Sequence, residues 1–141
     1  MRFWDSSAIV PLVADESSTA GLAAEYRRDP EMLVWWASDI ECMSALARRE
    51  REGGLDGPAM AASLRRLSAL AGSWRQVEPV TRVRQTAIRL VRVHPLRASD
   101  ALQLAAAIAA AEGEPSSLPF VTLDVRLAQV AEREGFPVIT A

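Results

Sequence analysis

Short apolar runs alternate along the chain with longer segments in which apolar residues recur every three or four positions. The short runs predict buried strands, and the longer spacing predicts amphipathic helices. We expect strands at residues 3–4, 32–36, 76–80, 120–123 and 137–139. We expect helices at residues 6–13, 18–28, 38–52, 56–71, 81–93, 99–111 and 125–134. Strands that alternate with helices indicate an α/β fold with a mostly parallel sheet covered on both faces.

Residues that typically begin or end helices lie at several of the predicted boundaries. Ser6 or Ser7 is expected to cap the first helix, Gly53-Gly54 to end the helix over 38–52, and His94-Pro95 to separate two later helices. No segment has the composition of a linker. The 141 residues are enough for one hydrophobic core, so the sequence predicts a single domain over residues 1–141.

Composition narrows the class of protein. Half of the residues are hydrophobic and no repeat or low-complexity tract occurs, which excludes disordered and solenoid proteins. No apolar segment approaches the roughly 20 residues of a membrane span, and Asp5 interrupts any secretion signal. Cys42 is the only cysteine, so no disulfide forms within the chain. We therefore expect a cytoplasmic protein without membrane association.

The charged residues argue against several kinds of binding and catalytic site. The formal net charge is −2, which argues against binding nucleic acid through bulk positive charge. All 16 basic residues are arginine, so the phosphate-loop lysine and Schiff-base catalysis are both excluded.

Two acids come directly after predicted strands. Asp5 follows the strand at residues 3–4, and Asp124 follows the strand at 120–123. Ligands of open α/β sheets bind beyond the carboxyl ends of the strands, so both positions are typical of a binding site. Close carboxylates need a compensating cation, which makes a metal the natural hypothesis. The alternative for each acid is a helix N-cap or a solvated loop position.

Asp100 opens a helix whose other residues are apolar except Gln103, so this helix is expected to be buried. A buried carboxylate without a partner costs several kcal/mol, of which the helix dipole offsets about 1 kcal/mol. The functional interpretation gives Asp100 a metal or Arg97 as its partner. The alternative is stabilisation by the dipole alone.

Glu41 has two possible roles. Its spacing from Ser38 is that of a capping box, in which the glutamate bonds back to the start of its own helix. In the other interpretation, Glu41 projects across the sheet edge toward the aspartates. Spacing alone leaves both open.

Four segments, in this order, resemble the motifs of the PIN domain family, and most closely those of the VapC-type toxins of bacterial toxin–antitoxin pairs. They are FWDSSAIVPL, ECMSALAR, LRASDALQLAAA and FVTLDVRLAQVAEREGFPVI. The resemblance spans nearly the whole chain and implies a PIN-like three-layer α/β/α sandwich. It also implies a metal site, with metal ligands or metal-bound waters at Asp5, Glu41, Asp100 and Asp124 and supporting hydroxyls at Ser6 and Thr122.

The residue types agree with this site. Carboxylates and hydroxyls without thiolate or imidazole suit Mg²⁺ or Mn²⁺ rather than zinc. The resemblance implies a metal-dependent endoribonuclease toxin that acts on structured RNA such as tRNA or rRNA, leaves a 5′-phosphate and a 3′-hydroxyl, forms a homodimer and is inhibited by a cognate VapB-type antitoxin. Arg97 is the first candidate for phosphate contact. Two alternatives remain: a catalytically silent PIN-like module that binds RNA or antitoxin, and a metal-dependent phosphatase of similar build.

Overall fold

The computed structural model describes all 141 residues and contains one sheet of five parallel strands. The strands are β1 (Arg2–Trp4), β2 (Met32–Trp35), β3 (Arg75–Val77), β4 (Phe120–Val121) and β5 (Val138–Ile139). Their order in the sheet is β3-β2-β1-β4-β5, and every neighbouring pair is parallel. The predicted mostly parallel sheet is confirmed and is parallel throughout.

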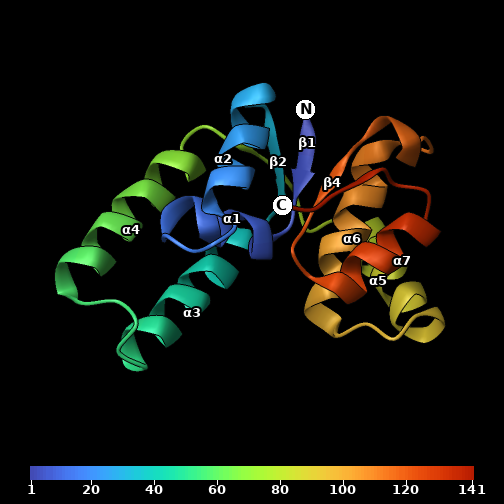
Figure 1. The fold of residues 1–141 in the computed structure, drawn as a ribbon. Helices are drawn as coiled ribbons and strands as arrows, with labels where there is room; N and C mark the ends of the chain where they lie inside the picture. Colours follow the sequence, from blue (N-terminus) through green and yellow to red (C-terminus); the bar gives the residue numbers. More distant parts are fainter.

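Seven helices cover the two faces of the sheet, so the fold is a three-layer α/β/α sandwich (Figure 1). One layer holds α1 (Ser6–Val13), α2 (Thr19–Arg28), α3 (Ser38–Arg51) and α4 (Gly57–Ala71). The other holds α5 (Thr81–Val93), α6 (Ala98–Ala111) and α7 (Val125–Arg133), and a short 3₁₀ helix (Pro115–Ser117) precedes β4. Crossing a bilayer requires a longer and more apolar helix than any found here.

Alternation along the central strand builds the two cores. Side chains of consecutive strand residues point to opposite faces, and Phe3 and Trp4, both fully buried, accordingly lie in different hydrophobic clusters. Phe3 stacks on Phe120 beneath α5, α6 and α7, whereas Trp4 packs edge-on to Tyr26 of α2. Each layer of helices therefore has its own core against one face of the sheet.

Several element boundaries differ from the sequence prediction. Strand β3 ends at Val77 rather than Val80, because Pro79 has no N–H to donate to a ladder. The expected cap of α1 at Ser6 or Ser7 is wrong: Asp5 is the N-cap, and its carboxylate accepts the N–H of Ser7. An ionised carboxylate at this position also interacts favourably with the positive end of the helix dipole.

The strand order creates a switch point between β1 and β4. From β1 the chain proceeds outward through β2 and β3, and it then returns to place β4 on the other side of β1. In such sheets the helices of neighbouring connections diverge beyond the carboxyl ends of the two strands, which leaves room for a ligand. Trp4 is in register with Val121, so Asp5 and Thr122 follow side by side at this point.

Candidate active site

Asp5 lies at the carboxyl end of β1 and is only 3% exposed. One of its carboxylate oxygens, Oδ2, accepts three hydrogen bonds: from the hydroxyl of Ser7, from the Ser7 backbone N–H at 3.3 Å and from the hydroxyl of Thr122 at 2.9 Å. The other oxygen, Oδ1, accepts none from the chain. The carboxylate is therefore fixed through one oxygen while the second is available to a ligand.

The hydroxyls of Ser7 and Thr122 join the ends of β1 and β4. Ser7 Oγ accepts the N–H of Leu123 at 2.9 Å, and Thr122 Oγ1 accepts the N–H of Asp124 at 3.1 Å. Thr122 was predicted as a supporting hydroxyl, and its contact is with Asp5. The role of Ser7 was missed, because the sequence offers two adjacent serines and only the helix geometry decides which of them faces Asp5.

Glu41 reaches away from its own helix. Its Oε2 accepts a hydrogen bond from Ser6 Oγ of α1 at 2.8 Å and from Gln103 Nε2 of α6 at 2.6 Å. The capping-box interpretation is wrong, because Ala37 is the N-cap of α3 and no side chain caps that helix. Ser6, predicted as a supporting hydroxyl, contacts Glu41 rather than Asp5. Glu41 Oε1 accepts no hydrogen bond from the chain.

Asp124 is the N-cap of α7, where its Oδ1 accepts the N–H of Leu127 at 2.8 Å, and its Oδ2 accepts none. The capping interpretation therefore holds for Asp124, as it does for Asp5, and in both cases it leaves one oxygen unused. A single carboxylate has two oxygens, so capping a helix and serving a site at the sheet edge are compatible roles.

Asp100 lies half-buried in the first turn of α6 and accepts no hydrogen bond from the chain. Arg97 is the N-cap of α6, but it forms no ion pair with Asp100. Burial raises the pKa of Asp100, the charges of Asp124 and Glu41 raise it further, and Arg97 and Arg126 act in the opposite direction. The arginines thus reduce the repulsion among the acids without neutralising it.

Asp5 carries the largest electrostatic cost among these acids. Burial raises its pKa from 3.8 to about 6 against the hydrogen bonds from Ser7 and Thr122, and the charges of Glu41 and Asp100 add to the rise. None of the four acids forms a salt bridge. Buried or mutually repelling carboxylates without a cationic side chain are stabilised by a bound cation.

An open cleft of about 470 Å³ lies beside these residues. Ser6, Ser7, Glu41, Asp100 and Arg48 are among the residues that line it. No three of the acids are already gathered around one point at metal-binding distance. The donor set nevertheless fits a hard divalent cation, because it consists of carboxylates, each with at least one oxygen that accepts no hydrogen bond from the chain.

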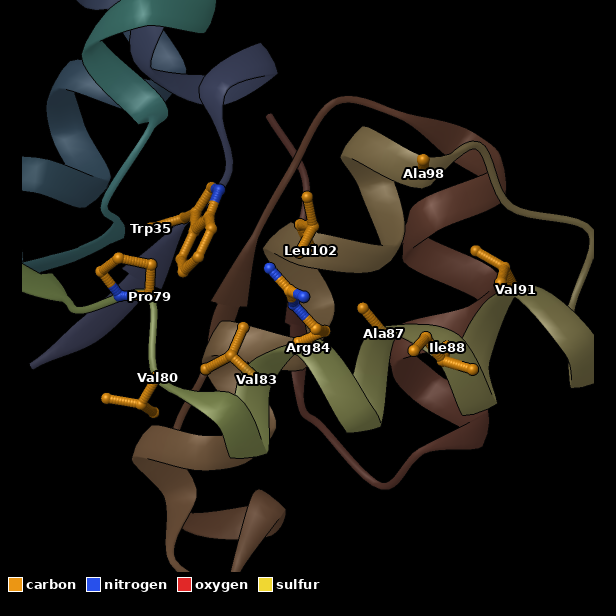
Figure 2. Close-up of a pocket in the computed structure, with 10 residues that line it drawn as sticks. All are labelled: Trp35, Pro79, Val80, Val83, Arg84, Ala87, Ile88, Val91, Ala98 and Leu102. Atoms are coloured by element: carbon orange, nitrogen blue, oxygen red, sulfur yellow. The ribbon is translucent and has the colours of Figure 1, made fainter.

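A groove with a mostly hydrophobic lining lies elsewhere. It has a volume of about 430 Å³ and runs along α5, with Trp35 and Leu102 on its far wall (Figure 2). Arg84 is its only charged lining residue. A groove without acids offers nothing to a cation, so it is separate from the candidate active site.

The fold and this edge define an α/β domain with an acidic site at the switch point of a parallel sheet. The profile of the PIN domain matches residues 2–133, and the chain belongs to the PIN domain family. The crystal structure of PAE2754 from Pyrobaculum aerophilum is similar, with a TM-score of 0.67 and 20% sequence identity over 99% of this chain and 87% of that one. No curated protein matched the chain. The predicted PIN fold is thereby confirmed.

Family membership gives a coarse statement of function. PIN domains are generally nucleases that use divalent metals. Membership of the family therefore supports a nuclease-type hydrolase function for this chain, with nucleic acid as the molecule bound. The acidic donor set at the switch point agrees with that class.

Proposed function

We propose that residues 1–141 form a single PIN domain that acts in the cytoplasm as a metal-dependent endoribonuclease, the toxin of a toxin–antitoxin pair. One observation carries the proposal. Four acids lie near enough to one another at the carboxyl edge of the sheet for their charges to interact, none has a cationic side chain as partner, and each keeps at least one oxygen free of hydrogen bonds from the chain.

The proposed roles follow from how each acid is held. Asp5, Asp100 and Asp124 would bind Mg²⁺ or Mn²⁺, and Glu41 would bind the metal or orient the attacking water. When bound, the ion supplies positive charge that offsets the acids and polarises the scissile phosphate. The hydroxyls of Ser7 and Thr122 hold Asp5, and the hydroxyl of Ser6 holds Glu41. As the resemblance to the PIN domain family implies, the proposed hydrolysis leaves a 5′-phosphate and a 3′-hydroxyl.

Two arginines are proposed to contact the phosphate backbone of RNA. Arg97 precedes Asp100, and its charge acts on that carboxyl. Arg48 lines the cleft with Glu41 and forms no ion pair in the chain, so its guanidinium is available. Arg97→Gln and Arg48→Gln are each expected to raise KM more than they lower kcat, because a phosphate contact serves binding. An unchanged KM in both variants would remove this part of the proposal.

The proposed partners are a structured RNA such as tRNA or rRNA, a cognate VapB-type antitoxin whose peptide occupies the acidic cleft, and a second copy of the chain. For the homodimer, the groove on α5 exposes Ile88 and Val91, which are 61% and 43% exposed, and a second copy would bury them (Figure 2). Light scattering on the wild type and on Ile88→Asp tests this. A wild type that is monomeric at tens of micromolar would refute the dimer.

The first test is cleavage of total cellular RNA by the antitoxin-free protein with Mg²⁺ or Mn²⁺. Cleavage is expected to stop in EDTA and in Asp100→Asn, and to continue in Asp15→Asn, which changes an exposed aspartate two residues after the end of α1. Activity retained in Asp100→Asn would refute the assigned site. Binding of RNA without cleavage would indicate a silent module, and hydrolysis of p-nitrophenyl phosphate without RNA cleavage would indicate a phosphatase.

A further inference from the structure

Gln103 is a fully buried amide in a helix that is otherwise apolar at its buried positions. The other buried residues of α6 are alanines and one leucine. Gln103 Nε2 donates to Glu41 Oε2 at 2.6 Å and to Ser38 Oγ at 3.3 Å. Its carbonyl Oε1 is buried and has no hydrogen-bond partner. A leucine would fill this position without leaving a polar atom unpaired, so core packing does not account for a glutamine here.

The orientation of the amide is set by Glu41. An ionised carboxylate only accepts hydrogen bonds, so the amide must turn its NH₂ group toward Glu41 and its carbonyl away. The carbonyl of Gln103 is unpaired because the NH₂ group points toward Glu41. A buried polar group left without a partner is unfavourable, which shows that the contact with Glu41 dominates at this position.

Glu41 is held from two sides through one oxygen. Ser6 of α1 and Gln103 of α6 both donate to Oε2, and Oε1 remains free of the chain. Gln103 follows Asp100 by three residues, and residues three apart lie on the same side of a helix. Helix α6 thus carries one acid of the site and the amide that fixes another.

We propose that Gln103 is a positioning residue that holds Glu41 in the orientation needed for metal binding and couples it to Asp100 through α6. The inference rests on the proposed function for its metal site but not for its substrate. Gln103 touches neither substrate nor metal in this role, so its effect must pass through Glu41.

The chain offers an unusually clean probe of this contact. It has no asparagine and four glutamines, of which Gln76, Gln85 and Gln129 are exposed. An ¹⁵N–¹H spectrum therefore contains four side-chain amide pairs, and only that of Gln103 is expected to exchange slowly with solvent. Its signals should shift in Glu41→Ala, whereas those of the other three glutamines should stay unchanged. Rapid exchange, or signals insensitive to Glu41→Ala, would overturn the proposal.

Metal affinity supplies the second test. Calorimetric titration with Mn²⁺ is expected to show about tenfold weaker binding in Gln103→Met, since residues that orient metal ligands change affinity by about 10 to 100-fold. Gln85→Met, an exposed change on α5, is the control. In a Glu41→Ala background, Gln103→Met should add less than a twofold loss, because the residue acts only through Glu41. Thermal unfolding of each variant confirms that it is folded.

The outcomes separate this inference from the nuclease proposal. Suppose that the wild type cleaves no RNA, and that Gln103→Met weakens Mn²⁺ binding only in the protein that keeps Glu41. The nuclease proposal then fails and the positioning role stands. If RNA is cleaved and Gln103→Met weakens Mn²⁺ binding equally with and without Glu41, the role is merely structural and the inference fails. A wild type that binds no Mn²⁺ overturns it as well.

Discussion

Asp5→Asn is expected to stabilise the metal-free protein. Asp5 is almost fully buried, and its pKa rises from 3.8 to about 6 in the folded state. A rise of this size means that the folded state disfavours the ionised carboxyl by about 3 kcal/mol at neutral pH, compared with the unfolded state. Asparagine has the same shape and keeps an oxygen for the cap of α1, but carries no charge. It lacks the stronger hydrogen bonds of a carboxylate to Ser7 and Thr122, so we expect a net gain of about 1 to 3 kcal/mol.

The sign of the pH dependence follows from the same shift. Between about pH 4 and pH 6 the folded state keeps the Asp5 proton while the unfolded state has lost it, so wild-type stability falls as pH rises through this range. Above pH 6 both states are ionised and the cost is constant. The gain in unfolding free energy from Asp5→Asn should therefore have its full value at pH 8 and be smaller by about 2 kcal/mol at pH 4.5.

Thermal unfolding in EDTA at the two pH values measures this effect. At pH 8 the melting temperature of Asp5→Asn is expected to exceed that of the wild type by about 3 to 10 °C. Saturating Mn²⁺ should reverse the order, because a ligand at about 1,000 times its Kd stabilises the protein that binds it by about 4.1 kcal/mol. An equal difference at pH 8 and pH 4.5, or a less stable variant at pH 8 in EDTA, would refute the electrostatic reasoning.

Three further changes test the fold. Leu104→Ala removes a fully buried side chain of α6 and should cost about 2 to 5 kcal/mol in urea unfolding; a loss below 1 kcal/mol would contradict the packing. Glu134→Gln breaks contacts with Arg89 and His94 that lower the pKa of Glu134, so its loss of about 1 kcal/mol at pH 7 should shrink as pH falls below 4.5. Asp124→Ala removes the cap of α7 and should cost about 1 kcal/mol, whereas Asp124→Asn should not.

The sequence was sufficient to predict the layers because hydrophobic patterning is a local property. Each predicted strand and helix exists, and the parallel sheet follows from their alternation. Errors fell at the ends of elements. Strand β3 stops before Pro79, and helix α1 is capped one residue before the predicted serines. At such positions backbone hydrogen bonding decides the boundary, and hydrophobicity carries little information about it.

The site was harder to predict because its contacts join residues far apart in the chain. Glu41 and Ser38 have the spacing of a capping box, yet Glu41 bonds to Ser6 and Gln103, which lie 35 and 62 residues away. No local rule distinguishes these outcomes. In the sequence, Gln103 stood out only as a polar residue within an otherwise apolar stretch of helix. That was the one local sign that it has a polar partner in the core.

The two capping aspartates show how this fold accommodates unpaired acids. Asp5 and Asp124 each begin a helix at the switch point, and each uses one oxygen for that helix. The helix dipole and the N–H groups hold the carboxylates in place, and the hydroxyls of Ser7 and Thr122 complete the support of Asp5. The capping bonds stabilise local structure whether or not a cation is present, while the free oxygens favour its binding. Substitution by asparagine should therefore separate the two roles, because it retains the cap and removes the charge.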